Sequence, residues 1–212
     1  MTLPWRSQWS PPEAELSRAL ARVRRDLPLL GLLESEEIAR KYPGTPVAAT
    51  AQCEMGLLLS GSGWLEEAQS AWGKLTAAPS SPDPFIRFEQ MRAQLLLGVL
   101  YQRRGRGEAA RLAWREVLTD YKDPGLKLSD GSTPAEMADF QIGVSYLAEG
   151  QTQQGVAYLR EFIQRRKDCY LARRAVTLLG KRGMRIGAAP PSASRRRIAY
   201  GHPVEKNPQS AI

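Results

Sequence analysis

The chain has 212 residues, 42% of them hydrophobic and 25% charged, which is an ordinary composition for one globular domain with tails. No segment approaches the roughly 18 uninterrupted apolar residues that a membrane-spanning helix needs, which argues against a transmembrane protein. Leu, Ala, Arg, Glu and Gln dominate over the β-branched residues, and because they lose little free energy in a helix, the composition favours an all-α fold.

The net charge of +8 is concentrated near the C-terminal end. Residues 165–212 contain 12 Lys and Arg but only two acidic residues, whereas residues 1–164 are close to neutral. A concentrated basic segment attracts anionic surfaces, so the body and the basic region are expected to meet different partners.

The chain begins with an extension over residues 1–11, ahead of a helical domain that we expect over residues 12–183. The extension lacks the long apolar core of a secretory signal, so the sequence predicts a cytoplasmic protein. Residues 12–26 and 29–41 are predicted to form two helices, with prolines in the first turn. This helix pair would cover one end of the structure that follows.

Three copies of one pattern come next, and five positions carry similar residues in each copy. In order, these positions hold Gly56, Gly98 and Gly143; Gly63, Gly105 and Gly150; Ala68, Ala110 and Gly155; Trp72, Trp114 and Leu159; and Leu75, Val117 and Phe162. A small residue at the first position lets a neighbouring helix approach closely, and the second glycine permits a turn between two helices. The pattern predicts packed helix pairs near residues 46–78, 85–121 and 134–168.

This pattern resembles that of the tetratricopeptide family, in which a small residue, a turn glycine, an alanine at the helix crossing and a bulky apolar residue recur. Gly56, Gly63, Ala68 and Trp72 match it, whereas the third copy departs from it at Gly155. The repeats also lie 42 and 45 residues apart, against about 34 in the standard repeat. The resemblance implies a short right-handed α-solenoid of about three antiparallel helix pairs, and a non-enzymatic scaffold or adaptor function.

The long connections rich in proline, together with the segment at residues 41–44, further resemble bacterial tetratricopeptide proteins of the Tol-Pal and outer-membrane-assembly kind. Those proteins carry an export signal or a lipid-attachment cysteine that this sequence lacks. The second resemblance therefore does not by itself predict a location in the cell envelope.

The C-terminal part is predicted to contain a capping helix at residues 170–182 and a basic tail at residues 184–212. The apolar side of the helix is expected to consist of Ala172, Ala175, Val176 and Leu179. The tail has no apolar periodicity, and we expect residues 188–212 to be disordered because they cannot bury enough surface.

Residues suited to catalysis are scarce in this sequence. The only histidine, His202, lies in the tail, and the two cysteines, Cys53 and Cys169, lack the spacing of metal ligands and are expected to be buried or free thiols. The run at residues 103–107 lacks the strand and the Lys-Ser/Thr ending of a phosphate-binding loop. We therefore expect no catalytic residue, no metal, no cofactor and no enzyme activity.

The resemblance places the first helix of each pair along a concave groove that would hold a protein or peptide partner. Carried over by position, the groove residues are Cys53, Leu57 and Ser60; Arg92, Leu95, Val99, Gln102 and Arg103; and Met137, Phe140, Val144 and Leu147. An apolar floor with a few basic and amide groups would suit an extended peptide or a helix. The alternative, which is equally open, is that most of these residues pack against the capping helices.

The basic region is the second candidate surface. It comprises Arg165, Arg166, Lys167, Arg173, Arg174, Lys181 and Arg182 near the last helices, and Arg195, Arg196 and Arg197 in the tail. These groups could contact the phosphates of a nucleic acid or an anionic lipid, or bind an acidic partner. Aromatic residues for base stacking are limited to Tyr170 and Tyr200, so the alternative is a region that only increases solubility.

Overall fold

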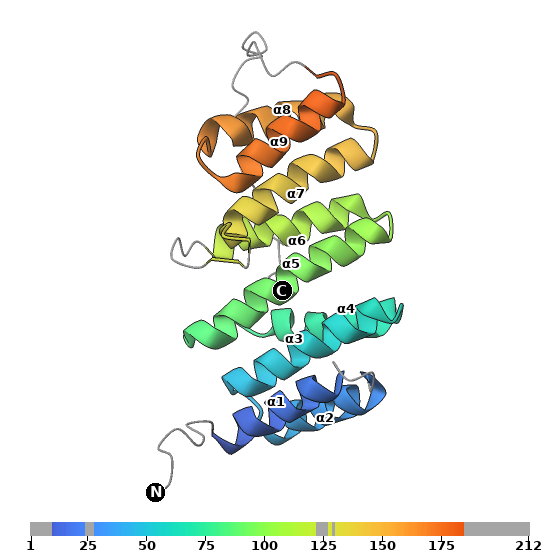
Figure 1. The fold of residues 1–212 in the computed structure, drawn as a ribbon, viewed down its shortest axis with the longest axis vertical. Helices are drawn as coiled ribbons and strands as arrows, with labels where there is room; N and C mark the ends of the chain where they lie inside the picture. Colours follow the sequence, from blue (N-terminus) through green and yellow to red (C-terminus); the bar gives the residue numbers. More distant parts are fainter. Residues whose placement is uncertain (1–9, 24–27, 122–126, 129, 185–212) are drawn as a thin grey trace, which may run out of the picture.

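The structure, a computed structural model, describes residues 10–23, 28–121, 127–128 and 130–184. Within these residues the chain forms nine α-helices and no strand, which confirms the all-α prediction (Figure 1). The helices are α1 (Pro11–Val23), α2 (Pro28–Lys41), α3 (Pro46–Gly61), α4 (Leu65–Ala77), α5 (Pro84–Arg103), α6 (Gly107–Asp120), α7 (Pro134–Ala148), α8 (Thr152–Arg165) and α9 (Tyr170–Lys181). None of them is long and apolar enough to cross a membrane.

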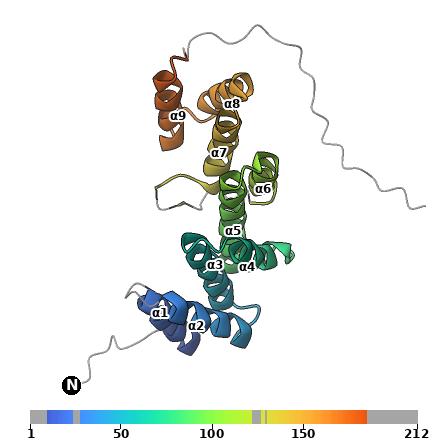
Figure 2. The ribbon, with the colours of Figure 1, turned by 90° about the vertical axis from the view of Figure 1, so that its right-hand side faces the viewer.

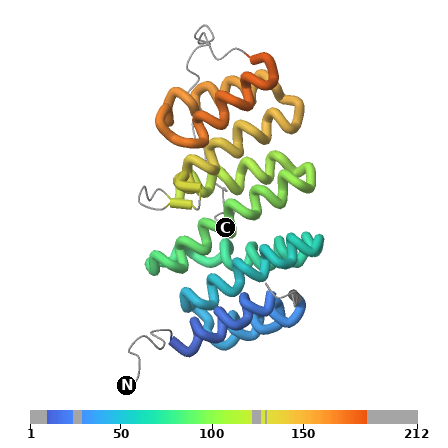
Figure 3. Tube along the Cα trace, viewed as in Figure 1, coloured from blue at the N-terminus to red at the C-terminus, as the bar shows by residue number. Residues whose placement is uncertain are grey.

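The helices lie across the long axis of the molecule and stack along it from α1 and α2 to α8 and α9 (Figure 3). Each helix packs against the next one in the chain, and α1, α3, α5, α7 and α9 also contact one another in sequence. Turning the molecule shows α6 and α8 on one side of the column that contains α5 and α7, with α9 on the other side (Figure 2). The arrangement is an α-solenoid of helix pairs, as predicted.

The repeated glycines account for the close packing within each pair. A Cβ atom added to Gly56 would overlap the indole of Trp72, and one added to Gly98 would overlap the indole of Trp114 in the same way. Each indole nitrogen donates a hydrogen bond to a backbone carbonyl of the partner helix, Trp72 to Cys53 at 3.0 Å and Trp114 to Leu95 at 3.2 Å. The first and fourth positions of the sequence pattern are therefore in direct contact.

Gly155, which departs from the family pattern, has a reason in the packing of the third pair. A Cβ atom at this position would meet the side chain of Leu147, which is buried against α8. Glycine in a helix costs about 1 kcal/mol relative to alanine, and here it makes room for a leucine. The glycine at this position is therefore matched to its neighbour: Leu147 of α7 occupies the space that a side chain at position 155 of α8 would fill.

Three helices begin with the same local signal. Thr45, Asp83 and Thr133 each accept hydrogen bonds from the first turn through their side chains, and a proline follows directly in each case. The cap satisfies backbone N–H groups that have no partner within the helix, and proline fits the first position because it has no N–H to satisfy. The sequence therefore marks where α3, α5 and α7 begin.

The buried amide of Gln90 fixes the connection between the first two repeats. Its nitrogen donates to the carbonyls of Leu75, Ala78 and Pro79, and its oxygen accepts from the backbone N–H of Ser81. One side chain thus satisfies backbone groups that would otherwise be left without partners at the end of α4. This contact holds α5 in a fixed position against α4.

The last helix of the stack, α9, differs from the prediction in which side chains it buries. The buried side of α9 consists of Leu171, Ala172, Ala175 and Leu179, so the assignment of Val176 to that side was wrong: it is exposed. A helical rotation of 100° per residue brings Leu171 into line with Ala175, whereas Val176 lies beyond the buried stripe. Residues 24–26 of the first predicted helix and the tail from residue 185 lie outside the described residues.

Candidate functional site

The first helices of the pairs form one face of the stack, and this face contains two hollows. The first, which we call the α1–α3–α5 hollow, has a volume of about 550 Å³. It is lined by Glu13, Leu16, Ser17, Leu20, Pro46, Val47, Thr50, Phe85, Phe88 and Glu89. The second, the α7–α9 hollow, has a volume of about 700 Å³ and is lined by Phe140, Gln141, Val144, Tyr170, Arg173, Arg174, Thr177, Leu178 and Lys181.

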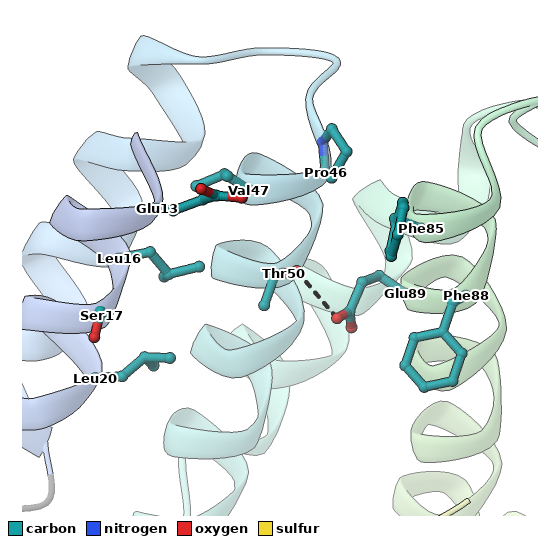
Figure 4. A pocket seen from close by; sticks show the side chains of 10 residues that line it. All are labelled: Glu13, Leu16, Ser17, Leu20, Pro46, Val47, Thr50, Phe85, Phe88 and Glu89. Carbon is teal, nitrogen blue, oxygen red and sulfur yellow. Dashed lines mark hydrogen bonds between the residues drawn. The ribbon is translucent and has the colours of Figure 1, made fainter. Parts of the chain in front are cut away.

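The α1–α3–α5 hollow is apolar on its walls and carries a carboxylate on α1, Glu13, and another on α5, Glu89. Figure 4 shows Leu16 and Leu20 on one side, Phe85 and Phe88 on the other, and Thr50 of α3 between them. Phe85 is 70% exposed, the highest value of any large apolar residue that the structure describes. The rim of this hollow therefore offers an aromatic surface to a partner.

The carboxylate of Glu89 in this hollow is already engaged. It accepts a hydrogen bond from the Thr50 hydroxyl at 3.1 Å (Figure 4), and its other oxygen lies 3.3 Å from the guanidinium of Arg92. Arg92 also pairs with Glu54 of α3 at 2.6 Å. Two carboxylates and one guanidinium thus form a network that links α3 to α5 and keeps a formal net charge of −1, to which the exposed carboxylate of Glu13 adds.

The α7–α9 hollow has the opposite electrostatic character. Arg173, Arg174 and Lys181 are exposed on α9, and within the described residues none of them forms an ion pair. The guanidinium of Arg174 lies over the ring of Phe140, 5.6 Å from its centroid, which is a cation–π contact. The hollow therefore combines three cationic groups with an apolar floor.

Asp130 is the acidic group that comes near this cluster. Its carboxylate accepts hydrogen bonds from the hydroxyl and the backbone N–H of Ser132, at 2.6 and 3.0 Å. These bonds, with a smaller contribution from Arg174, lower the pKa of Asp130 below its usual value. Asp130 is therefore ionised and offsets part of the positive charge near Arg174, but no ion pair joins it to Arg173, Arg174 or Lys181 within the described residues.

The predicted groove residues divide into two groups in the structure. Val99 and Arg103 are exposed on α5, and partly exposed positions are held by Leu57, Ser60, Arg92, Gln102, Met137 and Val144. Cys53, Leu95, Phe140 and Leu147 are buried. Of the predicted set, Phe140 and Val144 line the α7–α9 hollow. Arg92 forms an ion pair with Glu89, which lines the α1–α3–α5 hollow.

The burial of Cys53, Leu95 and Leu147 corrects their assignment to the groove. The carbonyls of Cys53 and Leu95 accept the indole hydrogen bonds, and Leu147 fills the space above Gly155. Burial, followed by the nearby Glu89 carboxylate, raises the pKa of the Cys53 thiol, so this cysteine stays protonated and unreactive at neutral pH. The structure contains both cysteines as free thiols.

The predicted basic residues are also separated by the fold. Arg165 is bound to Asp139, which is almost fully buried, at 2.9 Å, and to Glu161 at 3.5 Å, so its charge is compensated. Arg166 and Lys167 lie in the turn after α8, away from the two hollows. The prediction for Arg195, Arg196 and Arg197 falls outside the described residues.

Phe85, Glu89 and Tyr170 are site residues that the sequence reasoning missed. Phe85 follows the Asp83-Pro84 cap directly, and Tyr170 occupies the first turn of α9. An aromatic residue in the first turn of a capped helix is the signal that could have identified Phe85 and Tyr170, whereas Glu89, in the second turn of α5, carries no such signal. Groups of three or more His, Cys, Asp or Glu that could hold a metal ion are absent among the described residues.

A family model for the tetratricopeptide repeat matches residues 137–168, which span most of α7 and all of α8. No curated protein and no solved structure matches the chain. The family match does not distinguish subfamilies, so the resemblance to Tol-Pal proteins stays a prediction. The match covers one helix pair, and together with the glycine–tryptophan pairs and the helix stack it shows that this part of a helical repeat fold is similar to the tetratricopeptide repeat, a repeat that indicates a role in protein–protein interaction.

Proposed function

We propose that the chain is a scaffold or adaptor that holds a segment of a partner protein along the face formed by α1, α3, α5, α7 and α9. The observation that carries this proposal is the pair of hollows on that face, each with an apolar lining and polar groups at its rim. Grooves between helices recognise extended or helical segments by such a combination. Repeat stacks also leave one face continuous over several repeats, which suits an elongated ligand.

A displayed library of random peptides, selected against the full chain, tests this proposal. Peptides that bind should lose affinity when Val99, which is 38% exposed on α5, is changed to Asp, because the carboxylate disrupts an apolar contact in the groove. The matched control is Leu112→Asp on α6, a second helix, where the side chain is 53% exposed. Each affinity is measured by fluorescence anisotropy.

We expect selected peptides to bind the unmodified chain and Leu112→Asp equally, and Val99→Asp about tenfold more weakly, which corresponds to about 1.4 kcal/mol. Peptides that lose affinity only with Leu112→Asp would place binding on the outer face. The absence of any enriched peptide would contradict the groove proposal.

The alternative function, binding of nucleic acid or of an anionic surface, depends on the basic region. Binding through the basic region can be distinguished from binding in the groove, because binding to phosphates weakens steeply as the salt concentration rises. The compensated charge of Arg165 removes one of its candidate contacts. Selection at low and high salt, with the full chain and with a chain ending at Gly183, therefore distinguishes it from binding in the groove.

A further inference from the structure

The α9 helix turns one face into the stack and an adjacent face towards α7. Leu171, Ala172, Ala175 and Leu179 are buried. Arg174, Leu178 and Lys181 follow at spacings of four and three residues, so their side chains lie along one side of the helix and line the hollow with Phe140 and Val144. The cations are therefore placed beside an apolar floor by the helical period itself.

The three cations of this hollow form no ion pair within the described residues, and the nearby Asp130 offsets only part of their charge. Two cations of α5 do have acidic or polar partners: the partly exposed Arg92 pairs with Glu54 and Glu89, and Arg103 donates to the hydroxyl of Ser60. No described ion pair includes Arg173, Arg174 or Lys181, and Asp130 is bound to Ser132. A ligand that supplies carboxylates would complete this part of the surface.

We infer that the α7–α9 hollow binds an acidic segment of a protein partner that also carries apolar side chains. The carboxylates of the segment pair with Arg173, Arg174 and Lys181, and its apolar side chains cover Val144, Leu178 and the edge of Phe140. This inference rests on the proposed function and names the chemistry of the partner. It places the acidic residues of the partner at the α7–α9 end of the groove, whereas the α1–α3–α5 hollow is itself lined by the carboxylates of Glu13 and Glu89.

The apolar floor favours a protein segment over a nucleic acid. Binding of single strands depends on aromatic side chains on which successive bases stack, and Tyr170, 49% exposed, is the aromatic residue that the hollow presents openly. Val144 and Leu178 are aliphatic and gain nothing from a phosphate backbone. An acidic segment containing Leu or Phe satisfies both the cations and the floor.

The test uses the full chain and three fluorescein-labelled probes. They are a synthetic peptide that repeats Glu-Glu-Leu-Phe, the same peptide with every Glu replaced by Gln, and an oligothymidylate. The variant combines Arg173→Gln, Arg174→Gln and Lys181→Gln. The matched control removes the same number of charges outside the hollow, through Arg166→Gln, Lys167→Gln and Arg182→Gln. Circular dichroism melting checks that both variants keep the fold.

We expect the acidic peptide to bind the unmodified chain and the control variant alike, and the hollow variant about tenfold more weakly, since several exposed ion pairs are lost together. The Gln peptide should bind weakly to all three proteins and respond little to the hollow variant. In addition, Val144→Glu should reduce binding of the acidic peptide, because it places a like charge in the floor.

Equal loss of the acidic peptide in both variants would show attraction by net charge alone and overturn the inference. Tighter binding of oligothymidylate than of the acidic peptide, lost with the hollow variant, would assign the site to nucleic acid instead. If the acidic peptide does not bind the unmodified chain, the inference is wrong, while peptides that lose affinity with Val99→Asp would still support the groove proposal.

Discussion

The two hollows occupy similar places on the same face but differ in how their charges are compensated. In the α1–α3–α5 hollow, Glu89 is bound by Thr50 and Arg92. In the α7–α9 hollow, the exposed cations of α9 form no ion pair within the described residues, although Asp130 lies near Arg174. The repeated backbone therefore places similar hollows along one face of the stack. The charge of each hollow depends on which side chains the adjacent first helices of the pairs present to it.

The difference follows from which helix supplies the polar side chains. At the first hollow, α3 and α5 face each other and present Glu54 and Arg92, which neutralise one another. At the second, α9 is the last described helix, and α7 presents Phe140, Gln141 and Val144 to it. Because none of these three is acidic, the positive charge of α9 stays available.

The largest expected effect comes from the core beneath the first hollow. Trp72→Ala should cost about 3–5 kcal/mol in the free energy of unfolding, because it leaves a cavity and removes the indole hydrogen bond to Cys53. Urea denaturation measures the loss. Hydrogen exchange should show faster opening of α3 and α5 than of α7 and α9, because solenoid repeats contact only their neighbours.

Trp64→Ala is the matched control for this prediction, since that side chain is 47% exposed and should cost far less. Equal acceleration of hydrogen exchange in all helices would show that the stack unfolds as one cooperative unit. The two hollows would then not be independent in stability.

A smaller effect is expected at the ion-pair network. Glu89→Gln should reduce the free energy of unfolding by about 1–3 kcal/mol, because the buried carboxylate loses its charged bond with Arg92. It should also make the first hollow more positive and raise its affinity for the acidic peptide. Urea denaturation and anisotropy measure the two effects, and Glu36→Gln on the exposed face of α2 is the control. An unchanged affinity would contradict the contrast drawn between the hollows.

The smallest effect on stability is expected at Phe85. Because the ring is 70% exposed, Phe85→Ser should change the free energy of unfolding by no more than about 0.5 kcal/mol. It should nevertheless lower the affinity of those selected peptides that contact the α1–α3–α5 hollow, and leave the affinity of the acidic peptide unchanged. A parallel loss of both ligands would show that one continuous ligand fills both hollows.

Most of the fold was predictable because its signals are local. Gly56 and Trp72 recur with the same spacing as Gly98 and Trp114, and their direct contact in the structure explains why the spacing is kept. The cap residues before α3, α5 and α7 mark the helix starts in the sequence. The position of Val176 was predicted wrongly, since helical periodicity does not reveal where the buried stripe of a capping helix ends.

The candidate site was only partly predictable. Position in the repeat selected Val144, and the charge of the basic region selected the cations of α9, all of which line the α7–α9 hollow. Position in the repeat also selected Leu95 and Leu147, which are buried. Leu147 packs on Gly155 of α8, and Leu95 belongs to a core cluster with residues of α6 and α7, so the directions of both depend on how each pair is rotated in the stack. Phe85 and Glu89 were missed because their role depends on α1, which is distant in sequence.

The helical class, the pairing of helices and the tight turns follow from the amino-acid sequence, because each depends on side-chain volume and backbone freedom within one repeat. Gly63, Gly105 and Gly150, for example, have positive φ values of 86°, 71° and 76°. Which residues face the groove and which charges are neutralised there depends instead on how the helices pack against one another. Arg92, Arg165 and Arg174 look alike in the sequence, yet Glu54, Asp139 and the ring of Phe140 give them different surroundings. Such partners come from other helices, and their distances exist only once the stack has formed.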